Sequence, residues 1–251
     1  MMDQGIDLVF LHDSHGEQQL TDGAKPVENA VYFARLGQRI IHLLSTATAF
    51  GVLYEVDTRL RPSGKSGLLV SSLESYTQYQ HSQAWTWEHQ ALVRARPIGG
   101  SMTIALQFLA LRKEILCMPR EPNTLRTAVR DMRERMRGEL SQDSPGVFDL
   151  KQGHGGTVDI EFIIQYLVLL HAHHHPQITD HPDNLRTIEA LAAANLLPGD
   201  DAKMLQLAYV SFRHAMHALA LQQQPVLAKG DTFADLRAGV NQVWQTLLEQ
   251  G

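Results

Sequence analysis

The spacing of apolar residues changes once along this chain, and that change restricts the fold more than any other feature. Short runs typical of strands occur only before residue 72, whereas beyond Pro119 nearly every segment has the spacing of an amphipathic helix. The helices expected there cover residues 123–140, 158–175, 183–196, 200–222 and 232–249. This order predicts an α+β domain followed by an all-α helical bundle. We place the boundary near residues 119–122, which predicts domains at 1–120 and 121–251.

Two strand segments and an intervening helix are expected near the start of the chain. Ile6 to Leu11 is a short apolar run that predicts a buried strand, and residues 27–49 have helical spacing. Residues 52–61 alternate with period two, and turn-forming residues lead from them into the short apolar run 68–70. This pattern predicts an antiparallel hairpin.

Three more helices are expected before the predicted boundary. Ser71 or Ser72 should cap a helix that runs through Tyr79, because a serine hydroxyl can accept a hydrogen bond from a backbone N–H of the first turn. Residues 85–96 and 102–118 follow as helices, separated by a proline and two glycines.

Charge and cysteine content exclude several classes of protein. Lys and Arg total 22 against 27 Asp and Glu, a net charge of −5, so no overall basic field attracts nucleic acid or an anionic membrane. The single cysteine, Cys117, cannot pair within the chain, which is typical of a reducing compartment. Residues 162–170 form the longest apolar run, far short of the ~20 residues of a membrane helix, and the N-terminus lacks a signal pattern. We expect a cytoplasmic protein that binds neither nucleic acid nor a membrane.

Charged residues alternate along the second strand segment, at Glu55, Asp57, Arg59 and Arg61. Period two places all four on one face. Carboxylates bind Mg²⁺, and guanidinium groups hold phosphate oxygens in pairs, so this face suits a metal–polyphosphate complex. A solvated face with ion pairs among its own residues gives the same pattern, and spacing alone favours that simpler interpretation. Asp7 would add a second metal ligand if the two strands are neighbours.

Four blocks of this sequence resemble the family of bifunctional glutamine synthetase adenylyltransferase/adenylyl-removing enzymes. They are residues 7–13, 53–64, 85–96 and 157–162, in the family's order and distributed over nearly the whole chain. The resemblance implies a nucleotidyltransferase domain of the DNA polymerase β type followed by a helical bundle. Family members carry two such pairs: the N-terminal copy removes AMP from glutamine synthetase by phosphorolysis, and the C-terminal copy adds it from ATP.

The sequence of the first block, residues 7–13, resembles the corresponding segment of the C-terminal, AMP-adding copy. The resemblance therefore implies Mg²⁺ and ATP as cofactors, glutamine synthetase as the protein substrate, a PII-type nitrogen signal protein as partner and glutamine as effector. Two alternatives stay open: this is the adenylyl-removing half, or it is a non-catalytic module that docks glutamine synthetase or the PII-type protein.

The family motif Gly-Ser-Asp-x-Asp assigns roles to residues by resemblance. Asp7 matches its second Asp, and Asp57 matches the third carboxylate on the neighbouring strand, so both are expected as catalytic metal ligands. Residues of the following turn are implied near the phosphates, or as closing the hairpin beside them: Arg59, Arg61, Ser63, Gly64 and Lys65.

The sequence departs from the motif at its start. Gly5 stands where the first Asp belongs, and Asp3-Gln4 replaces Gly-Ser. We expect that the chain begins inside the catalytic motif. Because glycine has no side-chain oxygen for a metal, we also expect little or no turnover.

Two other features have both a structural and a functional interpretation. Glu88 is expected to form an ion pair with the arginines that end its block, although the resemblance suggests that Arg96 lies near nucleotide. Gly155 and Gly156 precede a helix, where they either expose N–H groups to an anion or form a tight turn with Asp159.

Structural roles are expected for the histidines and arginines of the predicted bundle. His171 and His175 have metal-ligand spacing, but cationic imidazoles near a helix C-terminus are the simpler interpretation. The arginines of residues 126–137 alternate with acids, which predicts an exposed, salt-bridged helix.

Overall fold

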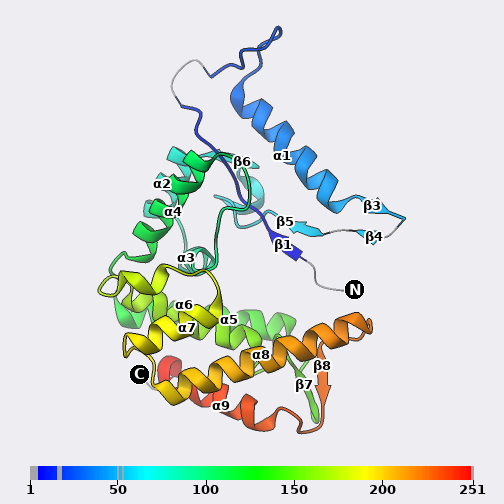
Figure 1. Cartoon of the computed structure of the whole chain (residues 1–251), viewed down its shortest axis with the longest axis vertical. Helices are drawn as coiled ribbons and strands as arrows, with labels where there is room; N and C mark the ends of the chain where they lie inside the picture. Colours follow the sequence, from blue (N-terminus) through cyan, green and yellow to red (C-terminus); the bar gives the residue numbers. More distant parts are fainter. Residues whose placement is uncertain (1–4, 16–18, 50, 53, 250–251) are drawn as a thin grey trace. The chain divides into compact units, whose positions relative to one another are not determined.

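The computed structural model describes residues 5–15, 19–49, 51–52 and 54–249, and over these the chain is α+β (Figure 1). Its α-helices are α1 (Asn29–Ser45), α2 (Leu73–Ser82), α3 (Thr86–Leu92), α4 (Met102–Leu116), α5 (Pro122–Leu140), α6 (Thr157–His171), α7 (Asn184–Ala193), α8 (Gly199–Leu221) and α9 (Ala234–Trp244). The strands are β1 (Gly5–Asp7), β2 (Phe10–His12), β3 (Ala47–Thr48), β4 (Gly51–Val52), β5 (Glu55–Asp57), β6 (Val70–Ser72), β7 (Val147–Asp149) and β8 (Leu227–Lys229).

The chain divides into two compact units. Among the described residues, one unit contains those up to residue 88 together with 97–111, and the other contains residues 89–96 and 112–249. The units are described separately below, as a sheet unit and a helical unit. A domain boundary near residue 120 stays a prediction.

The sheet unit is built on parallel strand pairs. The expected first strand is found as β1 and β2, which pair with β5 and β6 respectively, both in parallel. The predicted antiparallel hairpin is therefore wrong. Its two segments do not pair with each other, because residues 58–69 form an irregular turn with a 3₁₀ helix at Gly64–Ser66, and each segment pairs with the first strand region instead.

Helix α1 supplies the crossover that parallel strands require, and it contacts both β5 and β6. It ends at Ser45 and not at residue 49, because Ala47–Thr48 begins a short antiparallel ribbon with Gly51–Val52. A Cβ at Gly37 would lie 3.1 Å from Val70 Cγ2, so glycine lets the helix approach β6 closely. His12 stacks on Phe33 with 4.8 Å between ring centroids.

The cap predicted for the second helix is confirmed. Ser72 Oγ accepts a hydrogen bond from Ser75 N at 3.1 Å, and α2 begins at Leu73. The hydroxyl satisfies one of the N–H groups that a helix start leaves without an intrahelical acceptor.

The helical unit is organised around α6, which is buried along most of its length. It contacts α5, α7, α8 and α9, and a helix that is apolar on all sides is expected at the centre of such a bundle. Helices were predicted in all five of these places. The antiparallel pair of β7 with β8 was not expected, because each strand has only three residues and no clear alternation.

One prediction for this unit is wrong. Helix α5 is not simply an exposed, salt-bridged helix, because Arg133 is fully buried and Arg137 is nearly so. Both guanidinium groups bind Asp159 of α6: Arg133 Nε lies 2.5 Å from Oδ1, and Arg137 Nη2 lies 2.9 Å from the same oxygen. A partner 22 or 26 residues away in sequence cannot be recognised from the local charge pattern.

Candidate functional site

The two predicted metal ligands lie at matching positions of neighbouring strands. Asp7 of β1 is the register partner of Asp57 of β5. Register partners of a parallel pair present their side chains on the same face of the sheet. Asp7 is exposed and the Asp57 side chain is 27% exposed, so both carboxylates are open to solvent. The fold therefore brings the predicted acids together at an accessible edge of the sheet unit.

A basic rim borders this acid pair. Asp57 Oδ1 accepts a hydrogen bond from Arg59 N at 2.8 Å, and Oδ2 accepts one from Arg59 Nε at 2.6 Å. The Arg59 side-chain hydrogen bond is the main cause that holds the pKa of Asp57 below its ordinary value, and the charge of Lys65 adds to it. Asp57 in turn raises the pKa of Arg59, with a smaller contribution from Asp7. Asp57 is thus kept ionised, as a metal ligand must be.

The turn after β5 is closed by Arg61. Its Nη1 donates to the carbonyl and the hydroxyl of Thr58, both at 2.7 Å, and its other nitrogens donate to the carbonyls of Lys65 and Gly67 at 3.3 Å. Of the two roles expected for Arg61, the contacts support the closing of this turn. Ser63, with φ of 60°, and Gly64, with φ of 55°, both adopt the left-handed region.

Gly67, at the end of this turn, occupies a position that has no room for a side chain. A Cβ there would lie 1.9 Å from the Pro62 carbonyl oxygen, a backbone atom that cannot rotate away. Gly67→Ala should therefore shift the turn and lower the free energy of unfolding by about 1–3 kcal/mol in urea titrations. Gly23→Ala is the control, since no heavy atom lies within 4 Å of its Cβ position. Equal midpoints for the two variants would contradict this account.

Gly5 adds no side-chain ligand to the acid pair. Gly5 lies opposite Glu55 in the β1–β5 register, two residues before Asp7, and it offers no side-chain oxygen. Asp3 and Gln4 lie outside the described residues. Within the described residues no group of three or more His, Cys, Asp or Glu side chains is arranged to hold a metal ion. Asp7 and Asp57 fit a partial Mg²⁺ site, in which water and phosphate oxygens would be the remaining ligands.

Glu88 does not form the expected ion pair with the arginines of its own block. Its carboxylate oxygens accept the Tyr79 hydroxyl at 3.1 Å, and Oε2 accepts Trp85 N at 2.9 Å. Arg94 instead binds Glu161 at 2.6 Å in the helical unit. Tyr79 was not predicted as a partner of Glu88, which lies nine residues further along the chain. The one available signal was the 85–96 block, which contains its partner.

The glycine-rich turn before α6 is a structural turn, as one of the two interpretations held. Gly155 N donates to Asp159 Oδ2 at 2.7 Å, so the carboxylate of this chain occupies the place of an external anion. Asp143 and Asp149 satisfy neighbouring backbone N–H groups, among them His154 N at 3.1 Å and Gln152 N at 2.9 Å. The 157–162 block therefore contributes to packing of the helical unit.

The histidines after α6 do not form a metal cluster with other ligands in the described part of the chain. The helix ends at His171, and burial, with the charges of His175 and His174, lowers the pKa of His171. This shift disfavours the cationic imidazole that was expected at His171, because desolvation disfavours the charged form.

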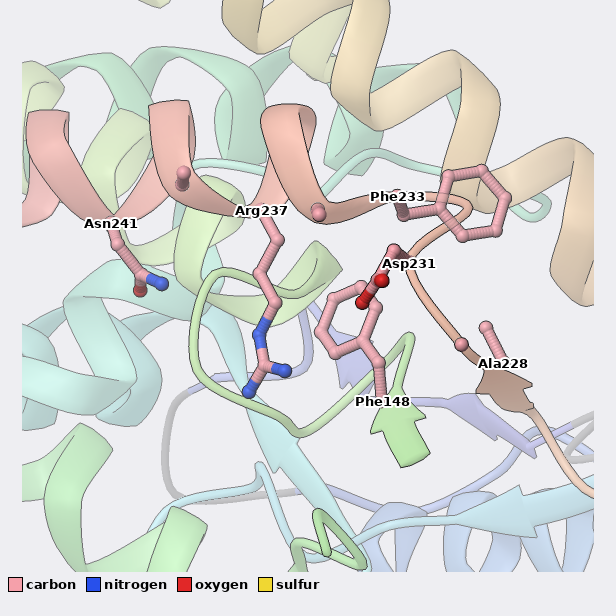
Figure 2. A pocket seen from close by; sticks show the side chains of 9 residues that line it. Phe148, Ala228, Asp231, Phe233, Arg237 and Asn241 are labelled. Atoms are coloured by element: carbon pink, nitrogen blue, oxygen red, sulfur yellow. The ribbon is translucent and has the colours of Figure 1, made fainter. Parts of the chain in front are cut away.

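A cavity of about 220 Å³ opens beside α9 in the helical unit (Figure 2). Arg237 projects into it from α9 and lies over the Phe148 ring, with 4.5 Å from Cζ to the centroid. Its Nη2 binds Asp143 Oδ2 at 2.5 Å and its Nε donates to the His154 carbonyl at 2.8 Å. This guanidinium already serves the glycine-rich turn. Separately, none of the helices in the described ranges is long and apolar enough to cross a membrane.

Two family models match different parts of the chain. Residues 3–111 match the family model of glutamate-ammonia ligase adenylyltransferase, and residues 124–238 match that of GlnD PII-uridylyltransferase. The chain is 50% identical over 246 residues to the bifunctional glutamine synthetase adenylyltransferase/adenylyl-removing enzyme of Thioalkalivibrio sulfidiphilus. The chain is homologous to one part of this enzyme.

Other relatives give the same result. The enzymes of the same name from Nitrosococcus oceani and Pseudomonas syringae pv. tomato are 50% and 48% identical, over 97% and 95% of this chain. The chain spans about a quarter of the length of the curated relatives it matches: 25% in each of these three enzymes, although 98% of the chain is aligned with the first. The resemblance seen in the sequence is thereby confirmed.

Proposed function

We propose that this chain is the AMP-adding, C-terminal portion of a glutamine synthetase adenylyltransferase, with a polymerase-β-type nucleotidyltransferase sheet and a helical bundle. The observation that carries the proposal is the pairing of Asp7 with Asp57 beside the basic turn 58–67. This pairing lies within residues 3–111, the part that matches the adenylyltransferase model. A cytoplasmic location belongs to the same proposal.

The chemistry joins a tyrosine hydroxyl of glutamine synthetase to the α-phosphorus of ATP. A new oxygen–phosphorus bond forms, the bond to the β-phosphate oxygen breaks, pyrophosphate leaves and the hydroxyl proton is lost. Mg²⁺, when bound, neutralises phosphate charge and polarises the reacting oxygens.

This chain's residues position the reactants. Asp7 and Asp57 would hold Mg²⁺ at the exposed edge of β1 and β5. Arg59, whose side chain is 69% exposed, can leave Asp57 for a phosphate oxygen when a cation takes its place on the carboxylate. Lys65 lies near enough to influence Asp57 and would meet the same phosphates. Ser63 and Gly64 shape the turn that presents both cations.

A second candidate is a non-catalytic module that docks glutamine synthetase or a PII-type signal protein, with glutamine as effector. Two observations favour it: Gly5 removes a metal ligand, and residues 124–238 match a family model named for a PII-uridylyltransferase. The adenylyl-removing, phosphorolytic half is a third candidate, since the relatives carry both activities in their name.

Intact mass spectrometry of unmodified glutamine synthetase, incubated with this chain, ATP and Mg²⁺, separates these candidates. A gain of one AMP per subunit that disappears in Asp57→Asn would support adenylylation, because the amide cannot supply the anionic ligand. Asp22→Asn, an exposed acid of a loop in the same unit, should keep the gain. Loss of AMP from adenylylated enzyme with phosphate would instead indicate the removing half. Binding of glutamine synthetase without either change would indicate a docking module.

A further inference from the structure

Helix α1 carries two apolar stripes with the same spacing, and its own sheet covers only one of them. The helix packs on β5 and β6, at the margin of the sheet unit (Figure 1). Its covered stripe contains one buried and three half-buried residues: Phe33, Gly37, Ile41 and Leu44. The outer stripe is displaced by one residue, about 100° around the helix. It consists of Tyr32, Leu36, Ile40 and Leu43, whose side chains are between 36% and 69% exposed.

The outer stripe forms a patch along the helix. Single exposed apolar residues are normal on a protein surface, whereas an aligned set over about three helical turns marks an interaction site. The ribbon of β3 and β4 returns to the C-terminal end of this helix, where Tyr54 N donates to the Leu44 carbonyl at 3.1 Å. Val52 and Tyr54 are 52% and 38% exposed. The ribbon therefore adds apolar surface beside the end of α1.

The charges that border the outer stripe are positive. Arg35 and Arg39 are exposed, and each precedes a member of the stripe by one residue, so both lie along the same side of it. Neither arginine forms an ion pair with any residue that the structure describes. Helix α1 contains no Asp or Glu, although the chain has a net charge of −5. Charge complementarity therefore favours a partner with acidic residues.

We propose that the outer stripe docks an amphipathic helix of a partner protein, whose apolar ridge covers the stripe and whose acidic residues pair with Arg35 and Arg39. Spacings of four, four and three residues form the kind of ridge against which a second helix packs. This inference goes beyond the proposed function and does not depend on it, because the outer stripe shares no residue with the acid pair or the 58–67 turn.

Two other occupants match these charges less well. In a symmetric pair of chains, the same flank of α1 is present on both sides of the contact, and the helix has no acid to pair with the arginines of its copy. An anionic membrane would attract the arginines, but helices that lie in a membrane surface are rich in cations on their polar face, and the net charge of −5 opposes this binding. An acidic protein helix matches both the ridge and the charge.

Two designed helical peptides test this surface. Both have the same leucine ridge, and the residues beside the ridge are Glu in one peptide and Lys in the other. Fluorescence anisotropy should show saturable binding of the Glu peptide, at least about tenfold tighter than that of the Lys peptide. Its affinity should fall as the salt concentration is raised, because salt screens exposed charges.

Two variants of the chain locate the binding. Leu36→Asp should weaken binding of the Glu peptide at least about tenfold, because it buries an unpaired charge beneath the peptide. The double change Arg35→Glu with Arg39→Glu should make the Lys peptide the tighter ligand. Both arginines are exposed, so this second variant does not disturb the packing of the sheet unit.

Leu207→Asp is the matched control, since it places the same charge on an exposed leucine of another helix, α8. It should leave peptide binding unchanged. Equal affinities of the two peptides, or equal effects of Leu36→Asp and Leu207→Asp, would overturn the inference. A light-scattering mass of two chains that Leu36→Asp halves would assign the stripe to a second copy instead. Sedimentation with phosphatidylcholine–phosphatidylserine vesicles that Leu36→Asp abolishes would assign it to a membrane.

Discussion

Asp159→Asn should unfold the helical unit under conditions in which the unaltered chain is folded. The carboxylate is fully buried and binds the guanidinium groups of Arg133 and Arg137, which are themselves buried. Asparagine keeps the shape but removes the charge, and its NH₂ group faces further donors, including Gly155 N. Removing one partner of a buried ionic group costs about 3–5 kcal/mol, a large part of the stability of an ordinary domain.

Urea unfolding followed by far-ultraviolet circular dichroism measures this loss, because most helices belong to the helical unit. Asp131→Asn is the control: it lies on α5 beside the same arginines, but its partner Arg130 and its own side chain are exposed. The control should change the free energy of unfolding by less than about 0.5 kcal/mol. A loss of that same small size in Asp159→Asn would show that Arg133 and Arg137 do not depend on this carboxylate.

Gly5→Asp should increase Mg²⁺-dependent ATP binding by at least about tenfold, a gain of the size that follows from completing a metal site. Position 5 lies two residues from Asp7 on β1 and opposite Glu55, so a new carboxylate would point to the face that carries the acid pair. Without Mg²⁺ the added charge should slightly destabilise the sheet unit, because like charges then face one another.

Titration of a fluorescent ATP analogue with and without Mg²⁺ checks this gain, and the glutamine synthetase mass assay shows whether AMP transfer rises with it. Gly23→Asp adds the same charge in a loop and should leave both measurements unchanged. An affinity of Gly5→Asp that equals that of the unaltered chain, with Mg²⁺ present, would contradict the metal role of this strand face.

Local patterns account for much of what was predicted correctly. Helical spacing is repeated over many residues, so the five helices of the helical unit and the apolar character of α6 follow from it. The Ser72 cap was visible for the same reason, since a helix start is decided within four residues. The resemblance to the family motif identified Asp7 and Asp57 as candidate metal ligands before their strands were known to be neighbours.

The sequence by itself determined which segments are helical and which face of a strand carries acids, because these depend on residues close together in the chain. Only the tertiary structure decided that β1 pairs with β5 in parallel, that Asp159 takes Arg133 and Arg137, and that Glu88 takes Tyr79. Alternation of residues along a strand specifies which face is charged but does not specify which strand lies beside it. A charged side chain has many possible partners of similar energy in the sequence. Packing selects one of them, because a buried polar group that lacks a partner is costly once water is excluded.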